Sequence, residues 1–411
     1  MTGSEESVDS VETATETATE TATETATESS KDAYEYGERD VGDLSHRALR
    51  PGEGRISGLI SLILGAGSFL GVLCFHFPEV LTTRELREVY DVDVIRKVLM
   101  VSMYAALGFG IFNFIRLRGR RWMGAAGVGF TILAFLMGGY RVQVGPVEQV
   151  GPGLGVDWML LDLLKSTIIF IFLEKLWPKY PEQPILRPEW KLDLGYFAVN
   201  HLLIGILLII ANGFAPEAFG WAVHDGVQQF VSNIWLPAQV LLLMFCADFV
   251  QYWVHRAYHE VSWLWGLHAV HHSAEHIDWL AGSRTHVVQT LIDRSLVFVP
   301  LYLLGPDPEA LNIYVVIVAF QAVLIHSNLS WNFGPLRYLF VTPQFHHWHH
   351  SKDRPAIDTN YAAHLPLLDL MFGSFHLPKT HWPKEYGTLK RLPRTFLGQL
   401  TYPFQRSAKK P

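Results

Sequence analysis

Long apolar segments without charge dominate the pattern of hydrophobic and polar positions in the first part of the chain. Residues 56–77, 98–115 and 122–140 contain no Asp, Glu, Lys or Arg. A helix of about 20 apolar residues is long enough to cross the hydrocarbon core of a bilayer. The pattern therefore predicts three transmembrane helices in this part of the chain.

Five further apolar segments are shorter or interrupted by polar residues. They are residues 158–177, 194–214, 234–254, 287–304 and 311–325. Asp162 and Lys165 weaken the first of them as a membrane span. Pro306 and Pro308 separate the last two, which we expect to form a hairpin that enters the membrane without fully crossing it. The whole pattern predicts an all-α integral membrane protein with a multi-helix transmembrane bundle.

One glycine pattern within the first apolar segment has two interpretations. Gly65, Gly67 and Gly71 have the outline of a dinucleotide-binding motif. That motif follows a strand and opens a helix, whereas this stretch is an uncharged apolar segment of helical length. Small residues at such spacing in a membrane helix favour close contact with another helix, and this is the interpretation that we prefer.

The distribution of basic residues predicts the orientation. Arg116, Arg118, Arg120 and Arg121 share one short loop, and such loops stay on the cytoplasmic side. The loop at 213–233 has no Lys or Arg and is expected outside. Counting spans then places the chain from residue 255 onward in the cytoplasm, provided that residues 158–177 cross the membrane. If they do not, the orientation reverses.

Composition divides the chain into four parts. Residues 1–50 hold a repeat of Thr-Ala-Thr-Glu without aromatic residues, which predicts a disordered acidic tail. Residues 51–150 form an N-terminal transmembrane region, 151–385 hold 17 of the 19 histidines, and 386–411 form a basic C-terminal tail. The net charge of −6 is concentrated in the first tail, and no charged block points to nucleic acid. Two cysteines are too few for a thiolate metal cluster.

Histidine is the unusual component of the composition. Twelve of the 19 histidines lie between residues 255 and 350, in three clusters with helical spacing. The clusters are His255-x-x-x-His259, His268-x-x-His271-His272 and His346-His347-x-His349-His350. Residues three or four apart share a helix face, so we expect each triplet to point at one centre. Eight imidazoles exceed the needs of one metal ion and predict a site for two.

Three alternatives compete with this interpretation. Lone histidines such as His76, His224 and His381 are best explained as ordinary polar residues, but dense clusters beside a membrane are costly without a partner. A zinc protease needs His-Glu-x-x-His, and this chain has Arg256 at the second position. A non-enzymatic membrane protein that binds or transports metal remains the second function class, and redox turnover with O₂ would distinguish the two.

Several motifs together resemble one enzyme family. Around the clusters stand Leu-Trp-Gly-Leu before His268, Ser-Ala-Glu275 after His272, Asn332-x-Gly-Pro-Leu and Asp358-x-Asn360-Tyr361. With the three histidine boxes they resemble the fatty acid hydroxylase / sterol desaturase superfamily of membrane di-iron oxygenases. The resemblance covers residues 190–380 and is strongest to its bacterial sterol-desaturase-like branch and to alkylglycerol monooxygenases.

The resemblance implies a set of metal ligands and no catalytic residue beyond them. The implied ligands are His255, His259, His268, His271, His272, His286, His326, His346, His349 and His350. The evidence for His286 is divided evenly between a ligand and a neighbour of the ligands. The residues expected to orient the imidazoles are Glu260, Glu275, Asp358 and Asn360. His347 falls on another face and is not expected to bind metal.

The same resemblance implies the chemistry. Two iron ions and O₂ would oxidise a C–H bond of a lipid, either by hydroxylation or by desaturation. No sequence motif for a flavin, a nicotinamide, a haem or an iron–sulfur cluster is present, so we expect a separate electron donor of ferredoxin or cytochrome type. The resemblance also favours a bacterial inner membrane. The sequence leaves open which lipid is oxidised.

Overall fold

The structure is a computed structural model that describes residues 55–83, 87, 91–116, 121–145, 153–379 and 381–405. Several predicted features lie outside these residues. They are the acidic tail 1–50, Arg118 and Arg120 of the basic loop, and the last residues of the basic C-terminal tail from 406 onward.

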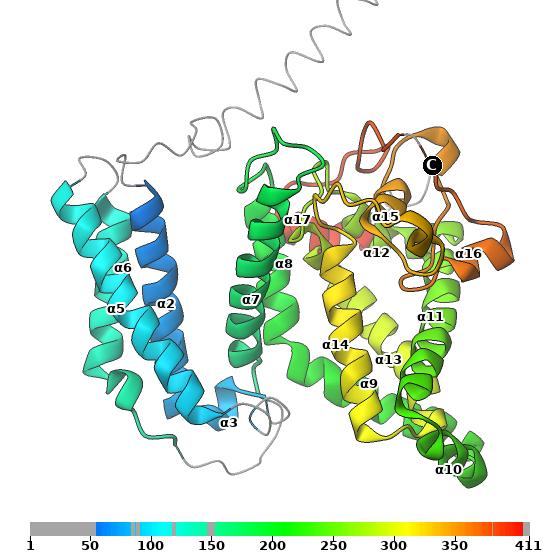
Figure 1. Ribbon diagram of the computed structural model, residues 1–411, viewed down its shortest axis with the longest axis horizontal. Coiled ribbons are helices and arrows are strands. Elements are labelled where there is room, and N and C mark those ends of the chain that lie inside the picture. Colours follow the sequence, from blue (N-terminus) through cyan, green and yellow to red (C-terminus); the bar gives the residue numbers. More distant parts are fainter. Residues whose placement is uncertain are drawn as a thin grey trace, which may run out of the picture. The chain divides into compact units, whose positions relative to one another are not determined.

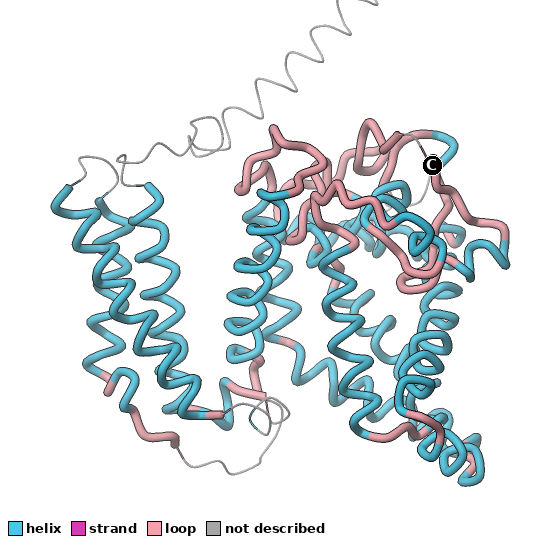
Figure 2. Tube along the Cα trace, in the orientation of Figure 1, coloured by secondary structure: helices cyan, strands magenta, loops and turns pink. Residues whose placement is uncertain are grey.

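The described residues are helical and contain no strand, only two isolated bridges (Figure 2). The α-helices of the first part are α2 (Arg55–His76), α3 (Pro78–Leu81), α5 (Val92–Arg116), α6 (Arg121–Leu136) and α7 (Val156–Leu176). The middle part contains α8 (Trp190–Leu202), α9 (Ile204–Phe219), α10 (Asp225–Asn233), α11 (Leu236–Glu260) and α12 (Ser262–His272). The last part contains α13 (Val287–Leu304), α14 (Pro308–Leu324), α15 (Pro343–His349), α16 (Leu367–Phe372) and α17 (Phe396–Thr401). The predicted all-α fold class is confirmed.

Helices α2, α5 and α6 correspond to the three charge-free segments and lie side by side (Figure 1). All three are long and apolar enough to cross a membrane. Gly65 of α2 faces the backbone of Gly127 in α6 so closely that a Cβ at Gly65 would collide with it. The preferred interpretation of the glycine pattern, a close helix–helix contact, is therefore confirmed.

The later apolar segments differ in their ability to span a membrane. Helices α11 and α13 are long and apolar enough, which makes five candidate spans among the described residues. The sequence prediction underestimated α13, because its 18 residues suffice despite two charges. Helix α14 is shorter, and α7 is continuous but is not among the candidate spans. The expectation that the first helix of the hairpin is too short to cross is therefore wrong by length and composition, and the expectation for the second stays a prediction.

One predicted span is wrong. Residues 194–214 do not form a single helix, because the chain divides at Leu203 between α8 and α9. The polar residues before the break bond sideways to other elements. His201 Nε2 lies 3.1 Å from a carboxylate oxygen of Asp162 in α7, and Asn200 Nδ2 donates to the carbonyls of Ser283 and Thr285. These contacts fix the end of α8 against α7 and against the segment that follows α12.

Two apolar clusters support the histidine region. Leu243 and Met244 of α11 pack against Leu301 of α13 and Tyr314 of α14. Towards the end of α11, Tyr252 packs with Phe345 of α15 and with other residues that include Leu368 of α16. Figure 1 shows α12 and α15 at the end of α11 that lies away from α10. The three histidine boxes are thus carried by helices whose buried faces hold them together.

Candidate metal centre

Nine of the predicted ligands form two groups of imidazoles. The first group is His255, His259, His268, His272 and His349, and the second is His271, His326, His346 and His350. Within each group the ligating nitrogens lie within 4.8 Å of one another. None of the nine side chains is more than 8% exposed. The structure therefore places nine buried nitrogen donors at two adjacent positions.

The groups divide each triplet, which corrects the expectation that a triplet points at one centre. His268 and His272 belong to the first group, whereas His271 belongs to the second. His346 and His350 share the second group, and His349 joins the first. At about 100° per residue, positions i+3 and i+4 lie on opposite sides of position i. The i,i+4 pair therefore shares one group while the i+3 imidazole crosses to the other.

The spacing of the Nε2 atoms matches that of neighbouring ligands on one ion. His268 Nε2 lies 2.9 Å from His255 Nε2 and 3.0 Å from His272 Nε2. Two nitrogens bound at right angles, each about 2.1 Å from a metal, are about 3.0 Å apart. In the second group, the Nε2 atom of His346 lies 2.9 Å from that of His326 and 3.0 Å from that of His350.

The opposite ring nitrogen, Nδ1, faces an oxygen in six of the nine imidazoles. The oxygens are the carbonyls of Tyr361, Arg284, Ala322 and Thr359, a carboxylate oxygen of Asp358 and the amide oxygen of Gln289. A protonated Nδ1 donates to each of these acceptors, which leaves the lone pair on Nε2. Metal-bound imidazoles usually have this arrangement. The donor set therefore fits two metal ions.

One loop orients three members of the first group. Asp358 Oδ1 lies 3.1 Å from His259 Nδ1, and the carbonyl oxygens of Thr359 and Tyr361 lie 2.8 Å and 2.7 Å from Nδ1 of His349 and His255. Asp358 and Asn360 both adopt positive φ, of 60° and 61°. A positive φ is rare for residues other than glycine. Here it turns the Asp358 carboxylate and the carbonyls of Thr359 and Tyr361 towards the histidines.

Buried side chains hold that loop. Asn360 is fully buried, and its amide bonds to the backbone of Phe345 and His376. Asp369, which is also fully buried, accepts the N–H groups of Tyr361 at 2.7 Å and Ala362 at 2.9 Å. These bonds connect α15, the loop and α16, so the positions of the ligands depend on residues outside the histidine boxes.

The electrostatics keep the imidazoles neutral. Burial, reinforced by the neighbouring rings, holds the pKa well below that of a free imidazole for His268, His271, His272, His346, His349 and His350. Burial lowers the pKa of His326 to about 4. At neutral pH these rings carry no proton on the second nitrogen, which is the form that binds a metal.

The structure does not bring His286 to either group. Its Nε2 lies 3.0 Å from the carbonyl oxygen of Leu400, and its Nδ1 accepts the N–H of Val288 as the cap of α13. Both nitrogens are used by the backbone. Two predicted orienting acids also lie elsewhere, since Glu260 pairs with Arg256 at 2.7 Å and Glu275 lies 3.6 Å from Arg391.

Sequence reasoning missed most of the groups that orient the ligands. Gln289 and four backbone carbonyls face Nδ1 atoms, and no sequence motif distinguishes a carbonyl in this role. Of the two residues of the matched motif, Asp358 faces an imidazole, whereas Asn360 contacts none and holds the loop through the backbone of Phe345 and His376. The sequence signal for Gln289 is weaker, since it is one of several polar residues in α13.

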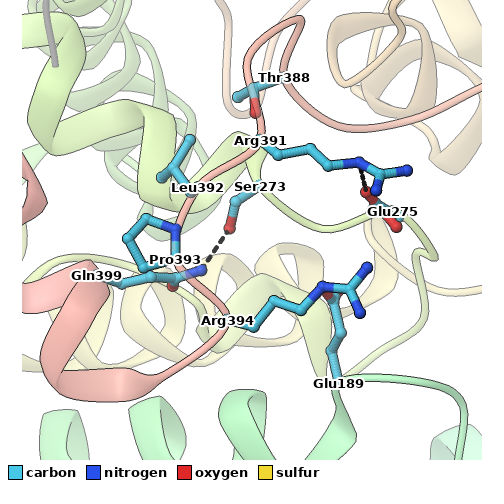
Figure 3. A pocket seen from close by; sticks show the side chains of 9 residues that line it. All are labelled: Glu189, Ser273, Glu275, Thr388, Arg391, Leu392, Pro393, Arg394 and Gln399. Carbon is cyan, nitrogen blue, oxygen red and sulfur yellow. Dashed lines mark hydrogen bonds and ion pairs between the residues drawn. The ribbon is translucent and has the colours of Figure 1, made fainter. Parts of the chain in front are cut away.

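A small polar cavity lies beside the second histidine box (Figure 3). Ser273, which directly follows His272, accepts hydrogen bonds from Gln399 Nε2 at 3.1 Å and from Arg284 at 3.2 Å. Arg391 and Glu275 form an ion pair at its rim. The cavity measures about 20 Å³, room for about one water molecule. The cavity lies between α17 and the end of α12, and it is too small for a lipid head group.

Close approach to His326 makes Gly282 a sensitive position. A Cβ at Gly282 would lie 2.8 Å from His326 Nδ1 and 3.0 Å from its Cγ. We expect Gly282→Ala to push this ring away and to reduce bound metal from about two ions to about one per chain. Elemental analysis of the purified protein measures this. Gly129→Ala is the control, since nothing lies within 4 Å of its added Cβ, and equal metal loss in both variants would contradict the prediction.

Comparison with known proteins agrees with this geometry. A family model described as fatty acid hydroxylase matches residues 240–374, which contain all nine imidazoles. Ornithine lipid hydroxylase OlsE of Rhizobium tropici is 39% identical over 259 residues, which is 62% of this chain and 77% of that relative.

Other relatives match over a smaller share. Alkylglycerol monooxygenase of Homo sapiens is 36% identical over 131 residues, 31% of this chain and 28% of that enzyme. A putative methylsterol monooxygenase of Dictyostelium discoideum is 25% identical over 201 residues, 48% of this chain and 72% of the relative. No solved structure matches the chain.

Proposed function

The chain belongs to the fatty acid hydroxylase family, and on this premise we propose that it is a membrane enzyme that hydroxylates a bilayer lipid with O₂ and two iron ions. The observation that carries the proposal is the pair of buried imidazole groups, with five and four members. The match over 259 residues to an enzyme named as a lipid hydroxylase supports hydroxylation over the other reactions of the family.

The proposed ligands are the nine imidazoles of the two groups, without His286. Imidazole suits iron as well as zinc. Two relatives are named as a hydroxylase and a monooxygenase, and oxidation by O₂ is chemistry that iron supports and zinc does not. When bound, the two ions would activate O₂ with electrons supplied by another protein, so that a C–H bond is oxidised.

The chain itself contributes position, charge balance and exclusion of water. The Nδ1 contacts fix the rings, and Asp358 offsets part of the positive charge beside His259. Exposed apolar side chains on α11 and α14, among them Phe245, Phe249 and Phe320, suit contact with lipid. A substrate dissolved in the bilayer would reach the ligands along these helices.

The location of the centre and its electron source are part of the proposal. We place the histidine groups on the cytoplasmic side of a bacterial inner membrane, which is where soluble ferredoxin- or cytochrome-type donors would find them. The relative from Rhizobium tropici supports a bacterial setting. Single-cysteine labelling at the exposed positions Gly226 and Lys384 in a cysteine-free background tests the orientation, since only position 226 should react from outside.

Metal content is the first test of the proposal. Protein purified after expression with ample iron should contain about two iron ions per chain, because the nine donors form two groups. Elemental analysis decides the point. Zinc in place of iron, or a single ion, would contradict a di-iron enzyme and favour a protein that only binds metal.

The reaction is tested in cells and then with isotope. Lipids from cells with and without the gene should differ by products that carry one added oxygen. Growth under ¹⁸O₂ should place the heavy isotope in those products, since a monooxygenase takes the oxygen from O₂ and a hydratase takes it from water. Unlabelled products would contradict the proposed function.

A further inference from the structure

Two charged residues interrupt α13, a candidate membrane span. Asp293 and Arg294 lie near its middle. An ionisable residue inside a span is costly and requires a partner. Asp293 has two partners, since Tyr258 of α11 donates its hydroxyl to Oδ1 at 2.9 Å and Gln289 donates Nε2–H to Oδ2 at 3.2 Å.

The contacts of Asp293 continue to a proposed metal ligand. The amide oxygen of Gln289 lies 3.3 Å from His268 Nδ1. The ring of Tyr258 is stacked on that of His268, with centroids 5.5 Å apart and planes inclined by 14°. Gln289 and Tyr258 are each at most 5% exposed. Three helices thus contribute to one chain of hydrogen bonds, which starts at the half-buried Asp293 and ends on the buried imidazole.

We propose that Asp293, acting through Gln289, is a positioning residue that selects the metal-binding tautomer of His268. This inference rests on the proposed function, because it takes the first imidazole group to be a metal site. An ionised carboxylate only accepts hydrogen bonds, so Gln289 must turn its NH₂ towards Asp293. Its oxygen then faces His268, which must carry its proton on Nδ1.

The tautomer of His268 matters because this residue is central to the first group. Its Nε2 is within 3.0 Å of the Nε2 atoms of both His255 and His272. A proton on this nitrogen would exclude the metal, since an N–H has no lone pair to donate. The carboxylate therefore acts on the site at a distance of two hydrogen bonds, in the way that a directly bonded carboxylate acts on other metal-bound histidines.

The experiment measures affinity for Fe²⁺ without O₂, by competition with a chelator, so it does not depend on turnover. In Asp293→Asn, one of the two accepting oxygens becomes an NH₂ group. The orientation that keeps an acceptor for the Tyr258 hydroxyl points this NH₂ at Gln289. Gln289 then turns over and presents its own NH₂ to His268, which favours the wrong tautomer. We expect the affinity of the first group to fall by about 10–100-fold, as for other lost partners of ligands. Asp225→Asn, at an exposed position in α10, should bind as the wild type does.

A charge swap distinguishes positioning from a structural role. In Asp293→Asn combined with Gln289→Glu, the carboxylate moves next to His268 and the amide moves behind it. His268 Nδ1 and the Tyr258 hydroxyl then donate as in the wild type, and only the bond between positions 289 and 293 changes direction. We expect affinity to return towards the wild-type value, although each single change lowers it. If Asp293→Asn does not fold, Gln289→Met removes both hydrogen bonds at similar volume and should show the same loss.

The outcomes separate this inference from the proposed function. No Fe²⁺ binding by the wild type would overturn the metal site itself. Wild-type binding that is unchanged in Asp293→Asn, or a double variant that binds no better than the single one, would overturn only the role of Asp293.

Discussion

His349→Ala is expected to abolish activity and to empty the first imidazole group, whereas His347→Ala should keep its metal. The two residues are two positions apart in α15 and both are buried. His349 belongs to the first group, with Nδ1 bonded to the Thr359 carbonyl at 2.8 Å. His347 belongs to neither group, and its Nδ1 lies 2.9 Å from the hydroxyl of Tyr386.

The size of the contrast follows from the role of each ring. Loss of a partner that orients a ligand already costs about 10–100-fold in metal affinity or activity, so loss of a ligand should cost more. Removal of His347 instead leaves a cavity beside Trp382 and Tyr386 and lowers the thermal midpoint.

Bound iron, product formed with O₂ and the thermal midpoint are measured for both variants. The expected pattern is metal loss without a large stability loss for His349→Ala, and the reverse for His347→Ala. Equal metal loss in folded samples of both variants would show that the assignment of the two rings is wrong.

The sequence contained enough information for the ligands but not for their pairing. The three boxes identify eight imidazoles because His-x-x-His-His is rare without a metal, and the family resemblance adds His326 as the ninth. Their division between two groups depends on where α11, α12 and α15 cross, and no single helix determines that. His271 therefore shares a group with His326, and His349 shares a group with His255, although both pairs are far apart in the sequence.

The pattern of apolar segments predicts the helices correctly where a segment has no charged residue. The prediction fails where polar residues in a segment have partners in other elements. Uncharged segments became α2, α5 and α6 because nothing in them favours a break. The segment at 194–214 looked equally continuous, but Asn200 and His201 bond to neighbouring elements and α8 ends directly after them. The role of Asp293 could not be predicted for a similar reason. The sequence alone does not show whether an acid in an apolar segment faces lipid or bonds to a residue such as Gln289.

Asp369→Ala is expected to destabilise the fold and to weaken metal binding in the first group, although Asp369 touches no imidazole in that group. Its carboxylate accepts the N–H groups of Tyr361 and Ala362 and the hydroxyl of Ser374 at 2.6 Å. The carbonyl of Tyr361 in turn orients His255. Each buried N–H left without an acceptor costs about 1–3 kcal/mol, so two of them lower stability strongly.

The isosteric substitution Asp369→Asn separates the effect on stability from the effect on metal binding. Asp369→Asn keeps the volume and one acceptor, so at most one of the two N–H groups loses its partner. We expect a smaller fall in the thermal midpoint than for Asp369→Ala, and metal loss confined to the first group. No imidazole of the second group has its Nδ1 bonded to the loop 358–361. About one ion per chain should therefore remain in both variants. Loss of both ions from a folded Asp369→Asn protein would show that the two groups do not hold metal independently, and retention of both would show that the loop does not position His255.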